Sequence, residues 1–254
     1  MRWPRLTAAD GGTFMKTSLR FTIQPQPDDT TCGPTCLQAI YAYYGDDVAL
    51  NSVIAEVPRL DDGGTLEVLL GVHALKRGYE ATIYSYNLHV FDPTWFSLKG
   101  DALPGLADNL ARQNRFKKSS KLRFTARHYV DFLRQGGRVR FQDLTLNLIR
   151  SFLKRSIPVL CGLSATYLYR SAREYGPKQD YDPIRGEPTG HFVVICGYDH
   201  AERKAIVADP LLGNPMGVGP LYSVDLSRLN CSIMLGIVTF DASLLIISKS
   251  SPPE

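Results

Sequence analysis

The sequence predicts an α+β protein, in which an N-terminal helical subdomain packs on a C-terminal antiparallel β subdomain. Apolar residues at helical spacing dominate residues 19–156, whereas short β-branched runs separated by Gly, Pro and Asp dominate residues 157–254. A chain of 254 residues is long enough for two such subdomains to share a core. We therefore expect residues 1–18 to form a loose arm and the two subdomains to form one domain, with a cleft where they meet.

The helical part begins with a short strand at residues 19–23 and a Pro-rich loop. Its first helix is predicted for residues 34–44, because an early proline, apolar residues at i, i+3 and i+4 spacing and the terminal Gly45 mark its length. The same reasoning predicts further elements along this part. They are helices at residues 49–56, 65–77, 101–117, 125–135 and 143–155, and a strand at residues 79–87.

The C-terminal part consists of short apolar runs that are rich in Val, Ile and Leu and bounded by turn residues. Runs of this length and composition are typical of buried strands. The predicted strands are residues 157–164, 191–199, 204–210, 232–240 and 243–248.

Composition places the chain among ordinary soluble globular proteins, with 44% hydrophobic and 21% charged residues. The net charge of +4 is too small to indicate nucleic-acid binding. No secretory signal is recognisable, and the longest apolar stretch is interrupted by Asp241 and is shorter than the ~20 residues that a membrane span needs. We expect a cytoplasmic protein without a membrane segment.

The five cysteines indicate reduced thiols, because their number is odd and no C-x-x-C pair occurs. Cys161, Cys196 and Cys231 lie in apolar runs and are expected to be mostly buried. The histidines show no ligand-like spacing with cysteines or carboxylates, so we expect no metal and no cofactor.

The stretch "QPDDTTCGPTC" (residues 26–36) holds the candidate nucleophile. A thiolate attacks and a thiol does not, so a catalytic cysteine needs an environment that favours the anion. Cys32 precedes Pro34 at the predicted helix start, where free N–H groups and the helix dipole supply such an environment. Cys36 lies one turn later and is expected in the core. Taken alone, Cys32 fits a small buried residue at a helix start better than it fits a nucleophile.

Three polar residues complete the candidate site. His191 lies at the head of an apolar strand, and Asp209 ends the next strand, so a hairpin between them would bring the two side chains together. Gln26 lies six residues before Cys32, where its side-chain amide could face an oxyanion. The alternatives are a histidine satisfied in the core and an aspartate that starts a turn before proline.

In order and spacing, these motifs resemble papain-like cysteine peptidases of the bacteriocin-processing, double-glycine type and their stand-alone relatives. The motifs are Q-x5-C-G-P from Gln26, GHFVV with GYD from Gly190, and D-P at Asp209, within residues 20–210. The resemblance implies a papain-like fold with a helical and a sheet subdomain. It also implies four catalytic roles: Cys32 as nucleophile, His191 as base, Asp209 as the group that orients His191, and Gln26 as oxyanion donor.

The resemblance implies a thiol hydrolase that cleaves a peptide or amide bond through an acyl-cysteine intermediate, on a small or leader-type peptide. Transporter-linked members of that family also carry membrane spans and an ATPase, neither of which the sequence contains, and residues 85–160 exceed what a minimal member needs. The substrate therefore does not transfer with the fold. Two alternatives stay open. One is γ-glutamyl or peptidyl transfer by the same Cys-His-Asp set, as in phytochelatin-synthase-like enzymes, and the other is an inactive peptidase-fold protein that binds a peptide.

The segment of residues 166–190 is long, aromatic and charged, and it leads directly to His191. It is either a surface loop or a substrate-recognition loop, and we favour the second because it must border the cleft if His191 is catalytic. The expected substrate-binding residues are Tyr169, Arg170, Arg173, Arg185 and Gly190. The arginines among them are suited to hold a carboxylate.

Residues 111–140 carry ten Lys or Arg against one acid, Asp131, a charge of +9. The stretch is either a pair of solvated helix faces or an electropositive wall that attracts an acidic peptide. RNA is the less favoured partner.

Overall fold

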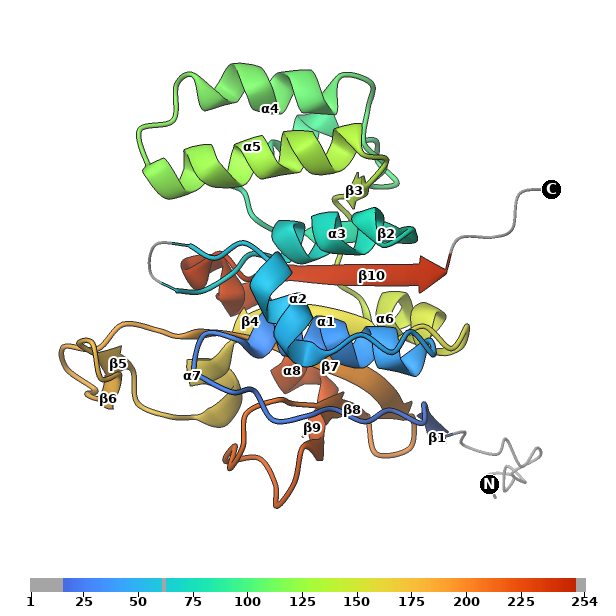
Figure 1. Cartoon of the computed structure of the whole chain (residues 1–254), viewed down its shortest axis with the longest axis vertical. Helices are drawn as coiled ribbons and strands as arrows, with labels where there is room; N and C mark the ends of the chain where they lie inside the picture. The colour runs from blue at the N-terminus through green and yellow to red at the C-terminus, as the bar shows by residue number, and fades with distance from the viewer. Residues whose placement is uncertain (1–15, 61–62, 250–254) are drawn as a thin grey trace, which may run out of the picture.

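An eight-stranded sheet forms the centre of the computed structural model, which describes residues 16–60 and 63–249 (Figure 1). Its strands are β1 Lys16–Ser18, β2 Tyr79–Ser85, β3 Arg138–Arg140, β4 Val159–Ser164, β7 Gly190–Asp199, β8 Lys204–Ala208, β9 Leu221–Asp225 and β10 Ser243–Lys249. They lie in the order β3-β2-β10-β4-β7-β8-β9, and β1 pairs with β7. The β2–β3 pair is parallel and the other pairs are antiparallel, as predicted for an α+β protein.

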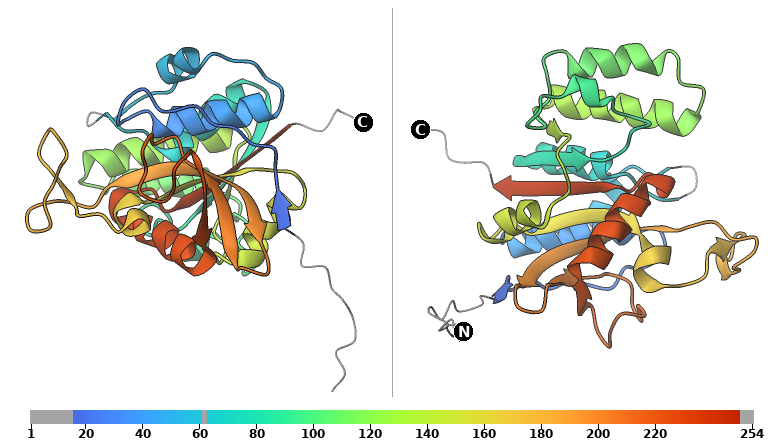
Figure 2. Two further views of the ribbon diagram at one scale, coloured as in Figure 1. Left: turned by 90° about the horizontal axis from the view of Figure 1, so that it is seen from below. Right: turned by 180° about the vertical axis from the view of Figure 1, so that it is seen from behind.

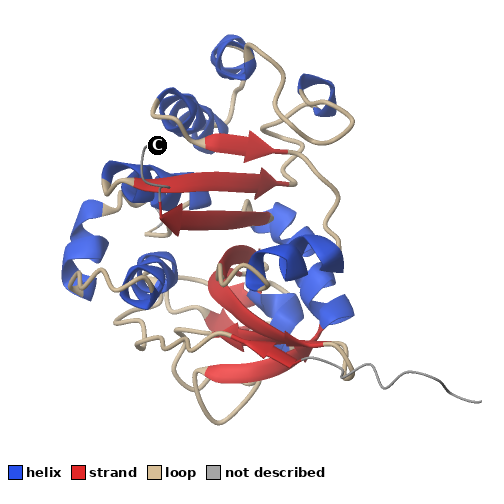
Figure 3. Ribbon diagram, turned by 90° about the vertical axis from the view of Figure 1, so that its right-hand side faces the viewer, coloured by secondary structure: helices blue, strands red, loops and turns tan. Residues whose placement is uncertain are grey.

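Helices cover both faces of this sheet (Figure 3). They are α1 Cys32–Tyr43, α2 Leu50–Glu56, α3 Glu67–Lys76, α4 Leu106–Asn114, α5 Ser120–Arg134, α6 Leu146–Leu153, α7 Ala165–Tyr169 and α8 Leu226–Leu235, with 3₁₀ turns η1 Pro93–Trp95 and η2 Gly236–Thr239. A separate two-stranded sheet, β5 Glu174–Tyr175 and β6 Asp180–Tyr181, lies between α7 and β7 in the chain.

The two faces of the sheet belong to two apolar clusters. Side chains alternate between the faces of a strand, so Val194 of β7 joins the cluster that contains Leu37 of α1. Its neighbour Val193 joins the cluster that contains Ile149 of α6. Because both faces are covered, β7 is apolar along most of its length rather than alternating.

One of two wrong strand predictions lies in the C-terminal part. Residues 232–240 form the end of α8 and the η2 turn. The buried residues of α8 include Leu226, Leu229 and Ile233, at helical spacing, while Met234 and Leu235 are exposed. The helical period begins at Leu226, before the apolar run of residues 232–240, and that run taken alone indicates a strand.

The N-terminal segment also differs from expectation. Residues 16–18, assigned to the loose arm, form β1 beside β7, and residues 1–15 lie outside the described part of the chain. Residues 19–23 are not a strand, although the Leu19 N–H still donates to the carbonyl of Cys196 at 2.8 Å. The predicted strand at residues 79–87 is confirmed as β2, and it lies inside the sheet between β3 and β10.

Two hairpins extend from the sheet in different directions. The helices α4 and α5 lie together at one end of the molecule, and the β5–β6 hairpin projects from another side, where Figure 2 shows it as a narrow loop. Within the described residues, none of the helices combines the length and the apolar character that crossing a membrane requires.

Candidate active site

Cys32 is the first residue of α1, so the helix begins two residues earlier than predicted. The loop before it is held by Asp28, whose Oδ1 accepts hydrogen bonds from the N–H and hydroxyl of Thr30 at 2.9 and 2.7 Å. As the first helical residue, Cys32 has a backbone N–H without an intrahelical acceptor, at the positive end of the helix dipole. Its side chain is half-buried, so the position suits a reactive thiol.

His191 and Asp209 are brought together by the β7–β8 hairpin that the sequence predicted. His191 is the second residue of β7 and Asp209 directly follows β8. Their side chains meet at 2.9 Å, between His191 Nε2 and Asp209 Oδ1, and both residues are buried, with exposed fractions of 6% and 1%. This bond leaves Nδ1 as the free ring nitrogen.

Asp209 accepts hydrogen bonds on both carboxylate oxygens. Oδ1 accepts from His191 and, at 2.9 Å, from the N–H of Leu211. Oδ2 accepts from the hydroxyls of Tyr169 and Tyr222, each at 2.7 Å. Burial alone would raise the pKa of Asp209, but the charge of His191 and these hydrogen bonds hold it below its usual range. The carboxylate is therefore a fixed, ionised partner for the imidazole.

Cys32 is the second residue that acts on the imidazole. The Cys32 and His191 side chains line the same cleft, and Cys32 contributes to the raised pKa of His191. Burial would lower the pKa of His191, but the negative charges of Asp209 and Cys32 outweigh it and raise that pKa to about 10. The raised pKa favours the protonated imidazole, which is the form that an ion pair with a thiolate requires.

Gln26 is tied to this site through its backbone. Its N–H donates to the carbonyl of Pro210 at 2.9 Å, which joins its loop to the segment after Asp209. Its side-chain Nε2 donates to the carbonyl of Asp28 at 2.9 Å, and Gln26 is not among the residues that line the cleft. The structure thus places Gln26 next to the site, while its role as oxyanion donor stays a prediction.

A cleft of about 430 Å³ opens beside Cys32 and His191. Its walls come from the loops before α1 and α3, the β5–β6 hairpin, and η2 with the segment after it. In the described part of the chain, four acidic residues and one lysine line it: Asp29, Glu174, Glu187, Asp241 and Lys121. The basic stretch of residues 111–140 therefore contributes a single side chain to the cleft.

The predicted substrate-binding residues lie in different places, and only Gly190 lines the cleft. Arg170 is exposed outside its lining. Arg173 donates to the carbonyl of Pro183, and Arg185 forms an ion pair with Asp182 at 2.6 Å, so both stabilise the β5–β6 hairpin itself.

Tyr169 is a separate case, because its hydroxyl holds Asp209. It is thus committed to orienting the carboxylate rather than free to bind a substrate. The segment of residues 166–190 does border the cleft, through residues on both sides of the β5–β6 hairpin.

Sequence reasoning did not identify Tyr222, Glu174 or the role of Asp241. Tyr222 belongs to β9, a strand whose polar and apolar residues alternate, but no strand was predicted there. In the sequence, Asp241 stands out only as a charge that interrupts a long apolar stretch. A carboxylate between two apolar segments was itself a signal of a special position.

The cysteines behave largely as expected, with one exception. All five are free, and Cys36, Cys161 and Cys196 are buried. Cys36 donates its S–H to the carbonyl of Phe192 at 3.2 Å and so fastens α1 to β7. Cys231, expected to be buried, is exposed, because its apolar run is a helix and it lies on the outer face.

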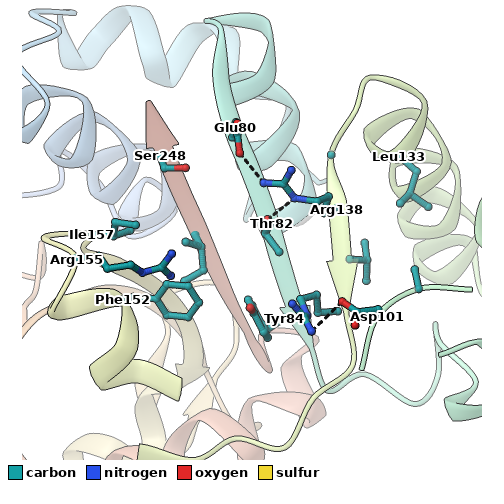
Figure 4. A pocket seen from close by; sticks show the side chains of 15 residues that line it. Glu80, Thr82, Tyr84, Asp101, Leu133, Arg138, Phe152, Arg155, Ile157 and Ser248 are labelled. Atoms are coloured by element: carbon teal, nitrogen blue, oxygen red, sulfur yellow. Dashed lines mark hydrogen bonds and ion pairs between the residues drawn. The ribbon is translucent and has the colours of Figure 1, made fainter. Parts of the chain in front are cut away.

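A second cavity, which we call the arginine groove, lies between β2, β3, β10 and α6 (Figure 4). It has a volume of about 510 Å³, and Arg138, Arg140 and Arg155 line it. Arg138 pairs with Glu80 at 2.6 Å and Arg140 pairs with Asp101 at 2.8 Å. The groove contains none of the predicted catalytic residues.

A cysteine at a helix start, in one cleft with a buried imidazole that is hydrogen-bonded to a carboxylate, is the arrangement that the papain-like resemblance predicts. The model of the Peptidase_C39 like family matches residues 18–216, and the chain belongs to that family. The predicted resemblance, the α+β papain-like fold and the general class of cysteine peptidase are thereby confirmed. No curated protein matches the chain in sequence.

Three solved structures are similar in outline. One is a double glycine motif protease from an AMS/PCAT transporter in complex with the leader peptide, with 14% identity, a TM-score of 0.45, and coverage of 93% of this chain and 99% of that one. Another is the peptidase domain of Streptococcus ComA, with 13% identity, a TM-score of 0.43, and coverage of 91% and 100%. Xylellain, a cysteine protease from Xylella fastidiosa, has 15% identity, a TM-score of 0.46, and coverage of 93% and 86%.

Proposed function

We propose that the protein hydrolyses a peptide or amide bond through an acyl-Cys32 intermediate. The observation that carries this proposal is the buried His191–Asp209 pair, which shares an open cleft with the thiol of Cys32 at the first position of a helix. A core histidine would need neither the thiol nor the cleft.

In the first step the Cys32 sulfur, having given its proton to His191, attacks the substrate carbonyl carbon. The negative charge that develops on the carbonyl oxygen is stabilised by the backbone N–H of Cys32 and the helix dipole. One N–H of the Gln26 side chain is engaged with Asp28, and the second is the candidate for a further donor. Collapse of this intermediate breaks the C–N bond, and His191 protonates the leaving amine.

Water completes the reaction. His191, now neutral, removes a proton from a water molecule, the hydroxide adds to the acyl carbon, and the C–S bond breaks to release the carboxylic acid. Asp209 stays ionised throughout and stabilises each imidazolium that forms. If another amine replaces water, the same intermediate yields transfer, so γ-glutamyl or peptidyl transfer is the second candidate reaction.

The proposed substrate is a small or leader-type peptide. The prediction of an acidic substrate rested on the basic stretch of residues 111–140, which contributes only Lys121 to the cleft. That prediction finds no support in the lining next to Cys32.

The test is incubation of the wild-type chain and Cys32→Ser with a positional-scanning library of peptides, read by mass spectrometry. New carboxyl termini and an acyl adduct on Cys32, in the wild type alone, are the expected result. Products in which an added amine replaces the carboxyl terminus would instead indicate transfer. Equal peptide binding by both proteins, without cleavage or adduct, would contradict the proposal and favour an inactive binding protein.

A further inference from the structure

The carboxylates of the cleft come from three segments. Asp29 precedes α1, Glu174 and Glu187 lie on the two arms of the β5–β6 hairpin, and Asp241 follows η2. Among the described residues, the lining carries one lysine, Lys121, against these four acids, so their formal sum is −3. Segments that are far apart in sequence thus converge to place like charges around the nucleophile.

Asp241 occupies a space that two glycines keep open. A Cβ on Gly190 would lie 1.8 Å from its Oδ2, and a Cβ on Gly162 would lie 2.2 Å from its carbonyl oxygen. Gly190 directly precedes His191 in β7, and Asp241 is only 7% exposed. Since a buried carboxyl group is costly, a fold that clears this position beside the base points to a use for it.

Glu174 and Asp241 both act on His191. Burial, and then the charge of Glu67, raises the pKa of Asp241 to about 7, while Thr239, Lys121 and His191 oppose that rise. Burial and the charge of Asp29 raise the pKa of Glu174, again opposed by His191. Like charges therefore repel one another in the empty cleft, and a cation bound among them would relieve that repulsion.

Within the described residues, no ion pair joins Asp29, Glu174 or Glu187 to a basic side chain. Their charges are thus available to a ligand. These carboxylates would meet the part of a ligand that lies near Cys32, because they line the same cleft as Cys32.

We propose that Asp241 and Glu174 are specificity-determining residues, which select a substrate with a cationic group (a lysine or arginine side chain, or a terminal ammonium) next to the scissile carbonyl. This inference rests on the proposed function, since it concerns the same cleft and the same nucleophile. It deepens that function by assigning a charge to the substrate.

The test measures the charge that Cys32 experiences, with reagents of equal reactivity class and opposite charge. The Cys32 sulfur attacks the thiol-side sulfur of a methanethiosulfonate, forms a mixed disulfide and releases methanesulfinate. The reagents are trimethylammonium-ethyl and sulfonato-ethyl methanethiosulfonate, with the uncharged methyl reagent as reference. Rates at Cys32 come from intact mass and peptide mapping, and 2-mercaptoethanol gives the intrinsic ratio.

We expect the cation-to-anion rate ratio at Cys32 to exceed the intrinsic ratio by about tenfold or more at low salt. Asp241→Asn and Glu174→Gln should each lower it by about threefold, and salt should lower it in the wild type. Glu202→Gln is the matched control: it removes the same charge from an exposed position outside the cleft, where Glu202 pairs with Lys204. It should leave the ratio unchanged.

A ratio equal to the intrinsic one, or a ratio that neither Asp241→Asn nor Glu174→Gln changes, would overturn the inference. Melting temperatures identify a variant that is not folded, and Glu174→Gln, on a surface hairpin, keeps the test decisive if Asp241→Asn unfolds. Failure of the proposed function has a different signature. In that case the uncharged reagent modifies Cys32 no faster than Cys231, and His191→Ala changes nothing, whatever the charge ratio.

Discussion

The active-site cleft and the arginine groove differ in how they handle charge. They have similar volumes, about 430 and 510 Å³, and both adjoin the central sheet. In the groove, Arg138 and Arg140 are neutralised by Glu80 and Asp101, so these charges link β3 to β2 and to a neighbouring loop. In the cleft, acids from separate segments face the nucleophile, and none of Asp29, Glu174 and Glu187 has an ion-pair partner among the described residues.

This difference separates structural charges from functional ones. Paired charges on a surface contribute modestly to stability and leave little field for a ligand. Charges that stay unpaired beside a reactive group shift its protonation and attract a ligand of opposite sign. The size of a cavity therefore says less about its role than the state of the charges that line it.

The largest effect is expected for His191→Ala. Without its base, the cleft loses the group that takes the proton from Cys32, and hydrolysis should fall by about 10³-fold or more. The measurement is initial rates on whichever library peptide the wild type cleaves. Activity within tenfold of wild type would contradict the role of His191 as base. The cleft would then differ from the arginine groove in its charges but would not hold this catalytic base.

The second-largest effect is expected for Asp209→Asn. It removes the charge that holds the imidazole, and we expect a loss of about 10²- to 10⁴-fold in activity and about 3 kcal/mol in the free energy of unfolding. Activity also distinguishes an orienting role of Asp209 from a purely structural one. A folded Asp209→Asn variant with full activity would contradict the orienting role.

The stability effect of Asp209→Asn should depend on pH in a defined direction. The pKa of His191 rises from 6.5 to about 10 on folding, so its contribution is complete below pH 6.5 and lost as the pH rises through about 10. The pKa of Asp209 is lowered from 3.8, so its contribution is present above that pH and lost as the pH falls below it. The free energies of unfolding of the wild type and Asp209→Asn, measured with denaturant, should therefore differ most between pH 3.8 and pH 6.5. A difference that is independent of pH would contradict the ion pair.

A smaller effect is expected for Tyr222→Phe. The change removes one of the two hydroxyls on Asp209 Oδ2 and leaves Tyr169 in place, so the cost should be about 1–2 kcal/mol of stability. Activity should fall less than in Asp209→Asn, because the carboxylate keeps its charge. Thermal unfolding and initial rates measure both, and Tyr198→Phe is the control for loss of a hydroxyl, because Tyr198 is buried but makes no hydrogen bond to Asp209.

The smallest effect is expected in the groove. Arg155 donates to the carbonyl of Ser151 and lies over the ring of Phe152, and it does not line the cleft. Arg155→Gln should change the free energy of unfolding by about 0.5 kcal/mol or less and leave hydrolysis as it is. A large loss of activity in a folded Arg155→Gln protein would mean that the groove and the cleft act together.

The parts of this site that follow strong local patterns were predictable from the sequence. Cys32 follows from its helix start, and His191 with Asp209 from two apolar strands joined by a short turn, because a hairpin fixes which strand ends meet. The helices within residues 19–156 were also predictable, apart from the residues at which they begin and end.

Convergence of distant segments was not predictable in the same way. Tyr222 and Asp241 reach the site through β9 and the segment after η2, and residues 232–240 were assigned as a strand although they end a helix. No local pattern states that Gly162 and Gly190 lie under Asp241. Such contacts depend on the order of strands in the sheet, which a single sequence leaves open.

The most direct test of the catalytic assignment is the rate of iodoacetamide alkylation at Cys32 as a function of pH, in the wild type, His191→Ala and Cys32→Ser. Peptide mapping separates Cys32 from Cys231, the other exposed or half-buried thiol. We predict rapid single-site labelling of Cys32 that persists down to about pH 6, slows markedly in His191→Ala and is absent in Cys32→Ser. Labelling of Cys32 no faster than that of Cys231, with no effect of His191→Ala, would contradict the assignment of Cys32 and His191 as nucleophile and base.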